Sequence, residues 1–322
     1  MTVALISHPA CLEHDTGAGH PERADRLRAV LAALDDPRFE GLARHEAPRA
    51  EVEHLTAVHD GSYVDAILAL EIERGDLGAL DADTIVSPGS VEAALRAAGG
   101  GILAVDLVMD GEADAAFVAV RPPGHHAEPA RAMGFCLFNN VAVAAHHARR
   151  RWGLKRIAVA DFDVHHGNGT QDAFWDDPDL LFVSSHQSPC YPGTGAGHER
   201  GRAGNIVNAP LDPGAGGRAF RDAWREVLIP ALDDFAPELV IISAGFDAHR
   251  ADPLAQLRLD EADFHWVTAE LAGVADRHAR ARVISLLEGG YDLAALAASA
   301  AAHVDALMRR PCQSSPVSLT RA

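Results

Sequence analysis

The stretch RIAVADFDVHHGNG, residues 156–169, joins a short apolar run to a dense polar segment. The apolar run is typical of a buried β-strand, and Asp161, Asp163 and His165 follow it at alternate positions. Alternate residues of an extended backbone point to the same side, so these three side chains are expected to lie together. Two carboxylates and an imidazole suit zinc, ferrous iron or another divalent ion, and three protein ligands leave a position for water. The spacing therefore predicts a catalytic metal site rather than a structural one.

Aliphatic runs alternate with longer amphipathic stretches along the whole chain of 322 residues. This pattern is typical of an α/β fold with a parallel sheet covered by helices on both faces. We expect a single domain over residues 1–310 and a loose C-terminal tail over 311–322. The expected strands are 3–7, 115–120, 156–160, 180–184, 238–243 and 282–287, and the expected helices are 21–34, 90–109, 140–152, 217–235, 261–280 and 293–310.

Composition excludes several classes of protein. The formal net charge of −18 argues against a nucleic-acid partner, because phosphate binding needs a basic surface. No run of eighteen apolar residues and no basic signal-type N-terminus is present, so we expect a soluble, cytoplasmic protein without a membrane partner. The four cysteines are far apart and form no CxxC pair, so the sequence suggests neither a disulfide framework nor a thiolate zinc site.

Four polar, glycine-rich loops follow four of the expected strands. Ligands of open parallel sheets bind beyond the carboxyl ends of the strands, so the loops are expected to meet in one pocket. They bring His125 and His126, the run from Asp161 to His165, Asp247, and Tyr291. An isolated aspartate such as Asp247 is usually a turn or capping residue, and Tyr291 alone could be a core tyrosine, but their combination favours a functional site.

A third pair of histidines, His146 and His147, has a different setting. It lies where an apolar helical stretch meets a basic end, VAVAAHHARRR over residues 141–151. We expect this pair on a solvated helix face.

Five ordered motifs make the chain recognisable: RPPGHHAE (121–128), GFCLFNNVAVAA (134–145), DFDVHHGNGTQ (161–171), SAGFDAHRADPL (243–254) and EGGYDL (288–293). Together with GHPERADRLRAV (19–30), they resemble the zinc-dependent histone deacetylase superfamily, above all its class II branch and the bacterial deacetylase-like amidohydrolases. The resemblance runs from about residue 7 to about residue 308. It implies a single-domain arginase/deacetylase fold with a central eight-stranded parallel sheet.

The resemblance also assigns residues. It implies one zinc ion per chain, held by Asp163, His165 and Asp247. Asn168 stands where class I relatives have an aspartate beside the general base, so we expect a differently tuned base. The implied catalytic residues are His125, His126, Asp161 and Tyr291, with His126 as the general base and acid. The implied substrate tunnel is lined by Gly134, Phe135, Tyr191, Leu254, Gly289 and Gly290.

Two sites for structural potassium or sodium ions are implied as well. The inner site matches Asp161, Asp163, His165, Ser184 and Ser185, and the second matches Phe174, Asp177 and Leu180.

The activity implied is removal of acyl groups, acetyl above all, from acyl-lysine peptides or small acylated amines by metal-activated water. Polyamine-selective relatives carry a glutamate where this chain has Leu254, which favours acyl-lysine over acetylpolyamines. An acetylpolyamine amidohydrolase, a binuclear manganese ureohydrolase and a non-catalytic binding protein stay open as alternatives. The oligomeric state, a homo-oligomer included, stays open too.

Overall fold

The fold is built on an eight-stranded sheet in which every neighbouring pair of strands is parallel. The computed structural model describes residues 2–309. The strand order is β2-β1-β5-β10-β9-β6-β7-β8, so the last strand of the chain lies in the middle of the sheet. The strands are β1 (Val3–Ser7), β2 (Leu42–Glu46), β5 (Ala115–Val118), β6 (Ile157–Asp161), β7 (Leu180–Gln187), β8 (Ile206–Leu211), β9 (Leu239–Ala244) and β10 (Val283–Leu287). This arrangement confirms the predicted fold class.

The six strands predicted from apolar runs are present, with boundaries that differ by up to three residues. All residues of β5, β6, β9 and β10 are buried, because helices cover both faces of the sheet. The two strands of this eight-stranded sheet that were not predicted, β2 and β8, form its two edges.

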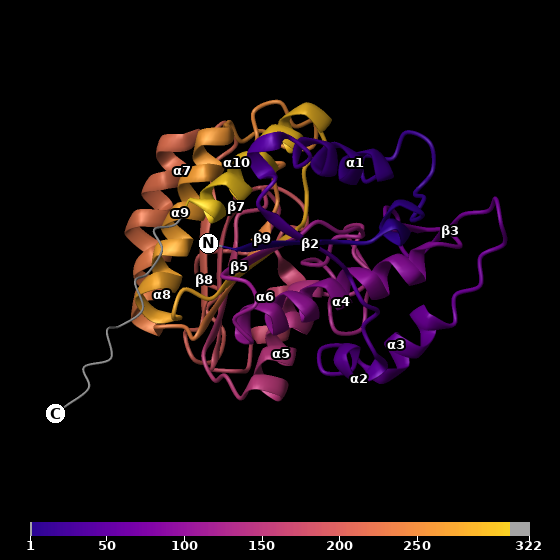
Figure 1. Cartoon of the computed structure of the whole chain (residues 1–322), viewed down its shortest axis with the longest axis horizontal. Coiled ribbons are helices and arrows are strands. Elements are labelled where there is room, and N and C mark those ends of the chain that lie inside the picture. The colour runs from indigo at the N-terminus through magenta and orange to yellow at the C-terminus, as the bar shows by residue number, and fades with distance from the viewer. Residues whose placement is uncertain (1, 310–322) are drawn as a thin grey trace.

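The helices form two layers, one on each face of the sheet (Figure 1). One layer contains α4 (Ser90–Met109), α5 (Asn140–Trp152) and α6 (Asn168–Phe174). The other contains α1 (Ala24–Ala33), α7 (Gly217–Ala223), the π-helical segment η3 (Trp224–Leu228), α8 (Ile229–Phe235), α9 (Glu261–His278) and α10 (Leu293–Met308). Short elements complete the fold: η1 (Pro9–Leu12), η2 (Pro37–Phe39), α2 (Val52–Leu55), α3 (Gly61–Leu68), and the hairpin β3 (Gly78–Ala79) and β4 (Ile85–Val86).

Three consecutive glycines in the middle of α4 allow this helix to pack closely on the sheet. A Cβ atom on Gly99 would lie 1.9 Å from the Pro48 carbonyl oxygen, and one on Gly100 would lie 2.7 Å from a Val118 methyl group. Glycine normally weakens a helix interior, but here the buried contact requires it.

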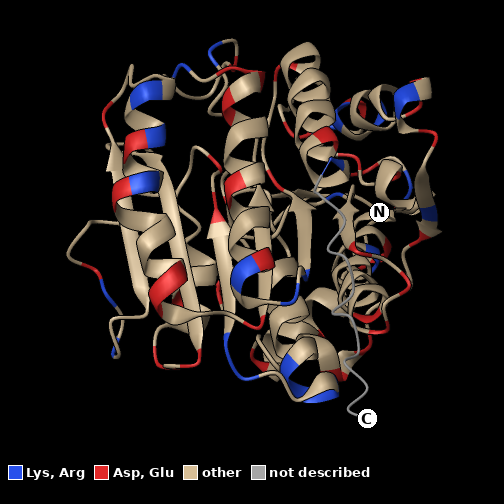
Figure 2. Cartoon of the chain, turned by 60° about the vertical axis from the view of Figure 1, so that its left-hand side comes forward, with Lys and Arg blue, Asp and Glu red and all other residues tan. Residues whose placement is uncertain are grey.

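Charged residues lie mainly in the helices and on the loops, and few lie in the strands (Figure 2). Among residues 2–309, no helix is both long and apolar enough to cross a bilayer. Cys11, Cys136 and Cys190 are free thiols. The predicted tail, 311–322, lies outside the described residues.

Candidate active site

The candidate metal site lies beyond the carboxyl ends of β6 and β9. Asp163 and His165 follow β6, and Asp247 follows β9. The His165 Nδ1 atom lies 3.1 Å from Asp163 Oδ1 and 3.1 Å from Asp247 Oδ2, and all three residues are buried. One ligand atom from each residue lies within 4.8 Å of the others. The structure thus brings together the three predicted metal ligands.

The charges of this cluster fit a divalent cation. Burial and the neighbouring Asp163 raise the pKa of Asp247 to about 7. Burial lowers the pKa of His165, but hydrogen bonds with Asp163 and Asp247 raise it well above its usual value. Two close buried carboxylates therefore require a positive charge between them. A metal ion held by these oxygen and nitrogen donors would supply that charge.

Gly289 closes this cluster from the β10 side. Its N–H donates to Asp163 Oδ2 at 2.8 Å, and a Cβ atom at this position would lie 2.1 Å from Asp247 Oδ2. A side chain here would therefore fill the space beside the two carboxylates.

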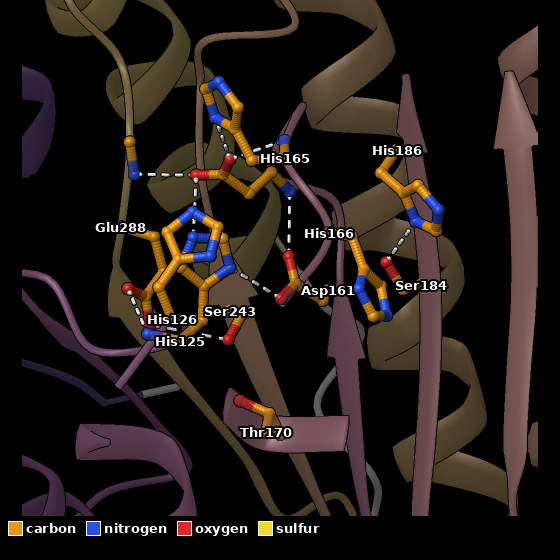
Figure 3. Close-up of polar contacts among 12 residues, drawn as sticks. His125, His126, Asp161, His165, His166, Thr170, Ser184, His186, Ser243 and Glu288 are labelled. Atoms are coloured by element: carbon orange, nitrogen blue, oxygen red, sulfur yellow. Dashed lines mark hydrogen bonds and ion pairs between the residues drawn. The ribbon is translucent and has the colours of Figure 1, made fainter. Parts of the chain in front are cut away.

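His125 is held by a carboxylate on each side (Figure 3). Its Nδ1 atom lies 2.9 Å from Asp161 Oδ2, and its backbone N–H donates to Glu288 Oε2, which also accepts from Gly124. Burial lowers the pKa of His125, but the charges of Asp161 and Asp163 raise it to about 10. The imidazole therefore carries a positive charge at neutral pH. The predicted pairing of His125 with Asp161 is present.

In contrast to the charged His125, His126 is a neutral imidazole. Asn168 Nδ2 donates to Glu128 Oε1 at 2.8 Å, so Asn168 Oδ1 is the atom that faces His126 Nδ1, also at 2.8 Å. Nδ1 must carry the hydrogen, which leaves Nε2 as an unprotonated base. Burial and the positive charges of His125 and His165 hold the pKa of His126 well below its usual value. Neighbouring groups with pKa values driven apart in this way are typical of catalytic sites.

Tyr291 lies in the short loop between β10 and α10. Its N–H donates to Asp252 Oδ2 at 2.7 Å. Arg26 lies 4.8 Å from the centre of the Tyr291 ring and donates to the backbone carbonyls of Gly290 and Glu288 at 2.6 and 2.5 Å. Burial raises the pKa of the Tyr291 phenol well above its usual value, so the hydroxyl keeps its proton and can donate a hydrogen bond.

A pocket of about 210 Å³ leads from the surface to these groups. The ring of Phe135 packs edge-on against Tyr291 at 5.9 Å, and the ring of Tyr191 packs edge-on against His126 at 5.1 Å. Phe135 has a φ of 70°, a strained conformation for a residue with a side chain and one often found at functional sites. The lining residues are Asp83, His126, Gly134, Phe135, His165, Tyr191, Leu254 and Tyr291. The predicted tunnel residues Gly134, Phe135, Tyr191 and Leu254 are among them, whereas Gly289 and Gly290 are not.

Asp83 is a pocket residue that sequence reasoning missed. It lies between β3 and β4, next to Thr84, whose hydroxyl accepts from the Phe135 N–H at 3.1 Å. Burial and the neighbouring Asp81 raise the pKa of Asp83. No local pattern in DADT (81–84) distinguishes it from an ordinary acidic turn.

A buried ionic network under Tyr291 was also missed. Glu22 accepts from Arg121 Nε at 2.5 Å and Nη2 at 2.6 Å, and from Arg26 Nη1 at 3.0 Å. All three side chains are completely buried. The spacing of four between Glu22 and Arg26, at the start of a helix, was the available signal.

The two predicted monovalent-ion sites differ in how well their residues fit an ion. At the inner site, Ser184 pairs with Asp161 in the β6–β7 register, as a shared site requires. Its hydroxyl lies 2.9 Å from His186 Nδ1, and the Ser185 hydroxyl accepts from Trp224. At the second site, the three carbonyls are already hydrogen-bonded by one side chain, that of Asn205. The Asn205 amide therefore lies among the carbonyls of the second predicted site.

The prediction for His147 was wrong. This residue is 9% exposed, and its Nε2 atom lies 2.7 Å from Asp106 Oδ1 on α4. The periodicity of α5 did not reveal that α4 packs against this face. His146 is partly exposed.

Comparison with known proteins places this site in a family. A profile described as "Histone deacetylase domain" matches residues 20–307. The chain is 39% identical to histone deacetylase 14, chloroplastic, of Arabidopsis thaliana over 94% of its length and 76% of that protein. It is 43% identical to the histone deacetylase-like amidohydrolase of Pseudomonas aeruginosa, over 85% of this chain and 73% of that protein. The crystal structure of the HDA15 HD domain superposes with a TM-score of 0.88 at 36% identity, covering 95% of this chain and 88% of that one.

Proposed function

Because the chain belongs to the histone deacetylase family, we propose that it is a zinc-dependent amidohydrolase. In this proposal the enzyme removes acyl groups, acetyl above all, from acyl-lysine or a similar acylated aminoalkyl amine. The observation that carries this proposal is one pocket in which His165, a member of the cluster Asp163, His165 and Asp247, lies next to an unprotonated imidazole and a neutral phenol. The proposed catalytic domain spans residues 1–310.

The proposed ligands, two carboxylates and one imidazole, leave a coordination position for water. A zinc ion bound there would act as a Lewis acid that polarises the amide carbonyl and lowers the pKa of water.

Side chains of this protein carry out the proton transfers, stabilise the oxyanion and bind the substrate. The free Nε2 atom of His126 accepts a proton from the attacking water and returns it to the leaving amine. Tyr291 donates a hydrogen bond to the oxyanion that forms on attack, a contact worth about 10² to 10³ in rate in comparable sites. The charged His125, held by Asp161, keeps His126 unprotonated by electrostatic repulsion. The rings of Phe135 and Tyr191 receive the aliphatic chain of the substrate.

Metal content separates the mononuclear site from its alternative. We expect one tightly bound zinc ion per chain, loss of hydrolysis on chelation, and recovery with zinc or cobalt. Two tightly bound ions in elemental analysis would favour a binuclear ureohydrolase instead. Failure to turn over any acetylated fluorogenic lysine peptide or acetylpolyamine, with one zinc bound, would favour a binding protein.

Asp83 supports acetylpolyamines as a second candidate substrate. Leu254, at 37% exposure, presents an apolar surface that packs against a lysine stem but gives a secondary ammonium no partner. Asp83 lines the same pocket and offers such a partner. We keep acyl-lysine as the first candidate because Asp83 is already engaged with Asp81 and Thr84.

Kinetics of two variants decide between these substrates. Leu254→Glu should raise kcat/KM for acetylspermidine relative to an acetyl-lysine peptide. If the unmodified enzyme already prefers acetylspermidine tenfold, about 1.4 kcal/mol, and Asp83→Asn removes that preference, then the polyamine is the substrate.

A further inference from the structure

The side chain of Asn205 makes an unusual set of hydrogen bonds just before β8. Its Nδ2 atom lies within hydrogen-bond distance of the main-chain carbonyl oxygens of Phe174, Asp177 and Leu180, at 2.8, 3.0 and 2.9 Å, and its two hydrogens are shared among these three acceptors. The residue is 5% exposed. One nitrogen therefore lies at the meeting point of three buried carbonyl oxygens.

The three carbonyls converge because of the turn that joins α6 to β7. The Asp177 N–H donates to the Phe174 carbonyl at 3.2 Å, and the Leu180 N–H donates to the Asp177 carbonyl at 3.1 Å. Two successive turns of this kind point carbonyls three residues apart toward the same side. Converging carbonyl oxygens create a negative potential that a donor or a cation must satisfy, and rings of such oxygens bind monovalent cations.

The other polar groups of Asn205 fix the orientation of its amide. Oδ1 accepts from the Ala203 N–H at 3.3 Å, and the backbone carbonyl accepts from the Phe182 N–H at 3.0 Å. An amide oxygen turned toward the three carbonyls would be repelled by all of them. Nδ2 is therefore the atom that must face the carbonyls.

Positive charge already surrounds this turn. Arg149 forms an ion pair with Asp177 and lies 3.9 Å from Asp179, while Arg202 pairs with Asp176 at 2.5 Å. These guanidinium groups neutralise the acidic residues of the turn, so none of these three carboxylates is free to attract an added cation.

We infer that the Asn205 carboxamide takes the place of a monovalent cation in this chain. The amide holds the carbonyls of Phe174, Asp177 and Leu180 together without an ion, and the second of the two predicted ion sites is replaced by a side chain. Removal of that side chain converts the same carbonyls into a site for potassium. This inference does not depend on the proposed function.

Anomalous scattering from thallium(I) tests the inference in the unmodified protein. Crystals are soaked in a thallium(I) salt, and the ion is located directly. We expect no anomalous peak within contact distance of the three carbonyls. A peak there, with the amide displaced, would overturn the inference, and this measurement needs no variant that might fail to fold.

Asn205→Ala provides the second arm. Its melting temperature should rise by at least about 2 °C more than that of the unmodified protein when choline chloride is exchanged for potassium chloride at equal ionic strength. A thallium peak should then appear among the three carbonyls.

Asn208→Ala is the matched control. Asn208 is a buried asparagine in β8 whose Nδ2 atom donates to a single acceptor, Gln171 Oε1, at 2.8 Å. Any potassium bound at the inner site contributes equally in all three proteins, so only Asn205→Ala should gain the extra response. An equal response in both variants, or no extra response in Asn205→Ala, would refute the replacement of the ion by the amide.

Discussion

Replacement of Asn168 by aspartate should raise the pKa of the His126 imidazole. The substitution puts a carboxylate where a neutral amide oxygen now lies 2.8 Å from His126 Nδ1. The negative charge stabilises the imidazolium form. As the pH falls, His126 therefore becomes protonated, and stops acting as a base, at a higher pH than in the unmodified enzyme.

The size of the expected pKa shift follows from the distance between His126 and the new carboxylate, and from the opposing effect of Glu128. At an effective dielectric constant of about 20, unit charges about 4 Å apart interact by about 4 kcal/mol, or about three pH units. Glu128 lies 2.8 Å from Asn168 Nδ2 and would face the new carboxylate, which would repel it. We therefore expect the acidic limb of the pH profile to move upward by about one to two pH units.

The assay is the pH dependence of kcat/KM for a fluorogenic acetyl-lysine peptide, with equal zinc content in all samples. Asn168→Asp is compared with the unmodified enzyme and with Asn168→Asp combined with Glu128→Gln, which removes the repulsion and should move the limb further. An acidic limb that stays in place in both variants would show that His126 is not the base that titrates, and the mechanism would be wrong.

Three further predictions concern the charged groups around the pocket. His126→Ala should lose about 10² to 10⁴ in kcat/KM, far more than His125→Ala, with the metal retained in both; equal losses would reverse the assigned roles. Glu22→Gln should lower the free energy of unfolding by about 3 to 5 kcal/mol in urea titrations, because Arg121 and Arg26 stay buried without their carboxylate; a loss below about 1 kcal/mol would contradict this. Burial raises the pKa of Glu22, but Arg121 and Arg26 lower it to about 2, so its stabilisation is complete above pH 4.5 and is lost as the pH falls toward 2. The stability difference between Glu22→Gln and the unmodified protein should therefore shrink between pH 5 and pH 3, and a constant difference would argue against the ion pair.

The central strands were predictable from sequence, and the edges of the sheet were not. The run over residues 3–7 coincides with β1, because a strand covered on both faces is apolar throughout. In β2 only Leu42 is buried, while Arg44 and Glu46 are exposed. In β8 a proline, Pro210, interrupts the apolar pattern. Edge strands have one neighbour and a weaker apolar signal, so periodicity did not detect them.

In the candidate site, too, the residues that are close in sequence were predictable, and those that come from distant segments were not. The proximity of the candidate ligands Asp163 and His165 was predictable because alternation along one strand end places them together. Asp83 and Glu22 reach the site from distant segments, and only the tertiary structure brings them there. The inferred replacement of the second ion could not be predicted for a related reason: the three carbonyls belong to one turn, whereas Asn205, which lies among them, comes from another loop.

The position of β10 between β5 and β9 has a consequence for biosynthesis. As the chain leaves the ribosome, the proposed ligands Asp163 and Asp247 and the proposed base His126 all emerge before this strand does. Until β10 inserts, β5 and β9 each keep one unpaired edge, and unpaired strand edges are prone to aggregate. The Tyr291 hydroxyl arrives only with the loop behind β10. The strand that completes the sheet and the proposed catalytic Tyr291 are therefore synthesised one after the other, and a chain that ends before them is expected to be both inactive and prone to aggregate.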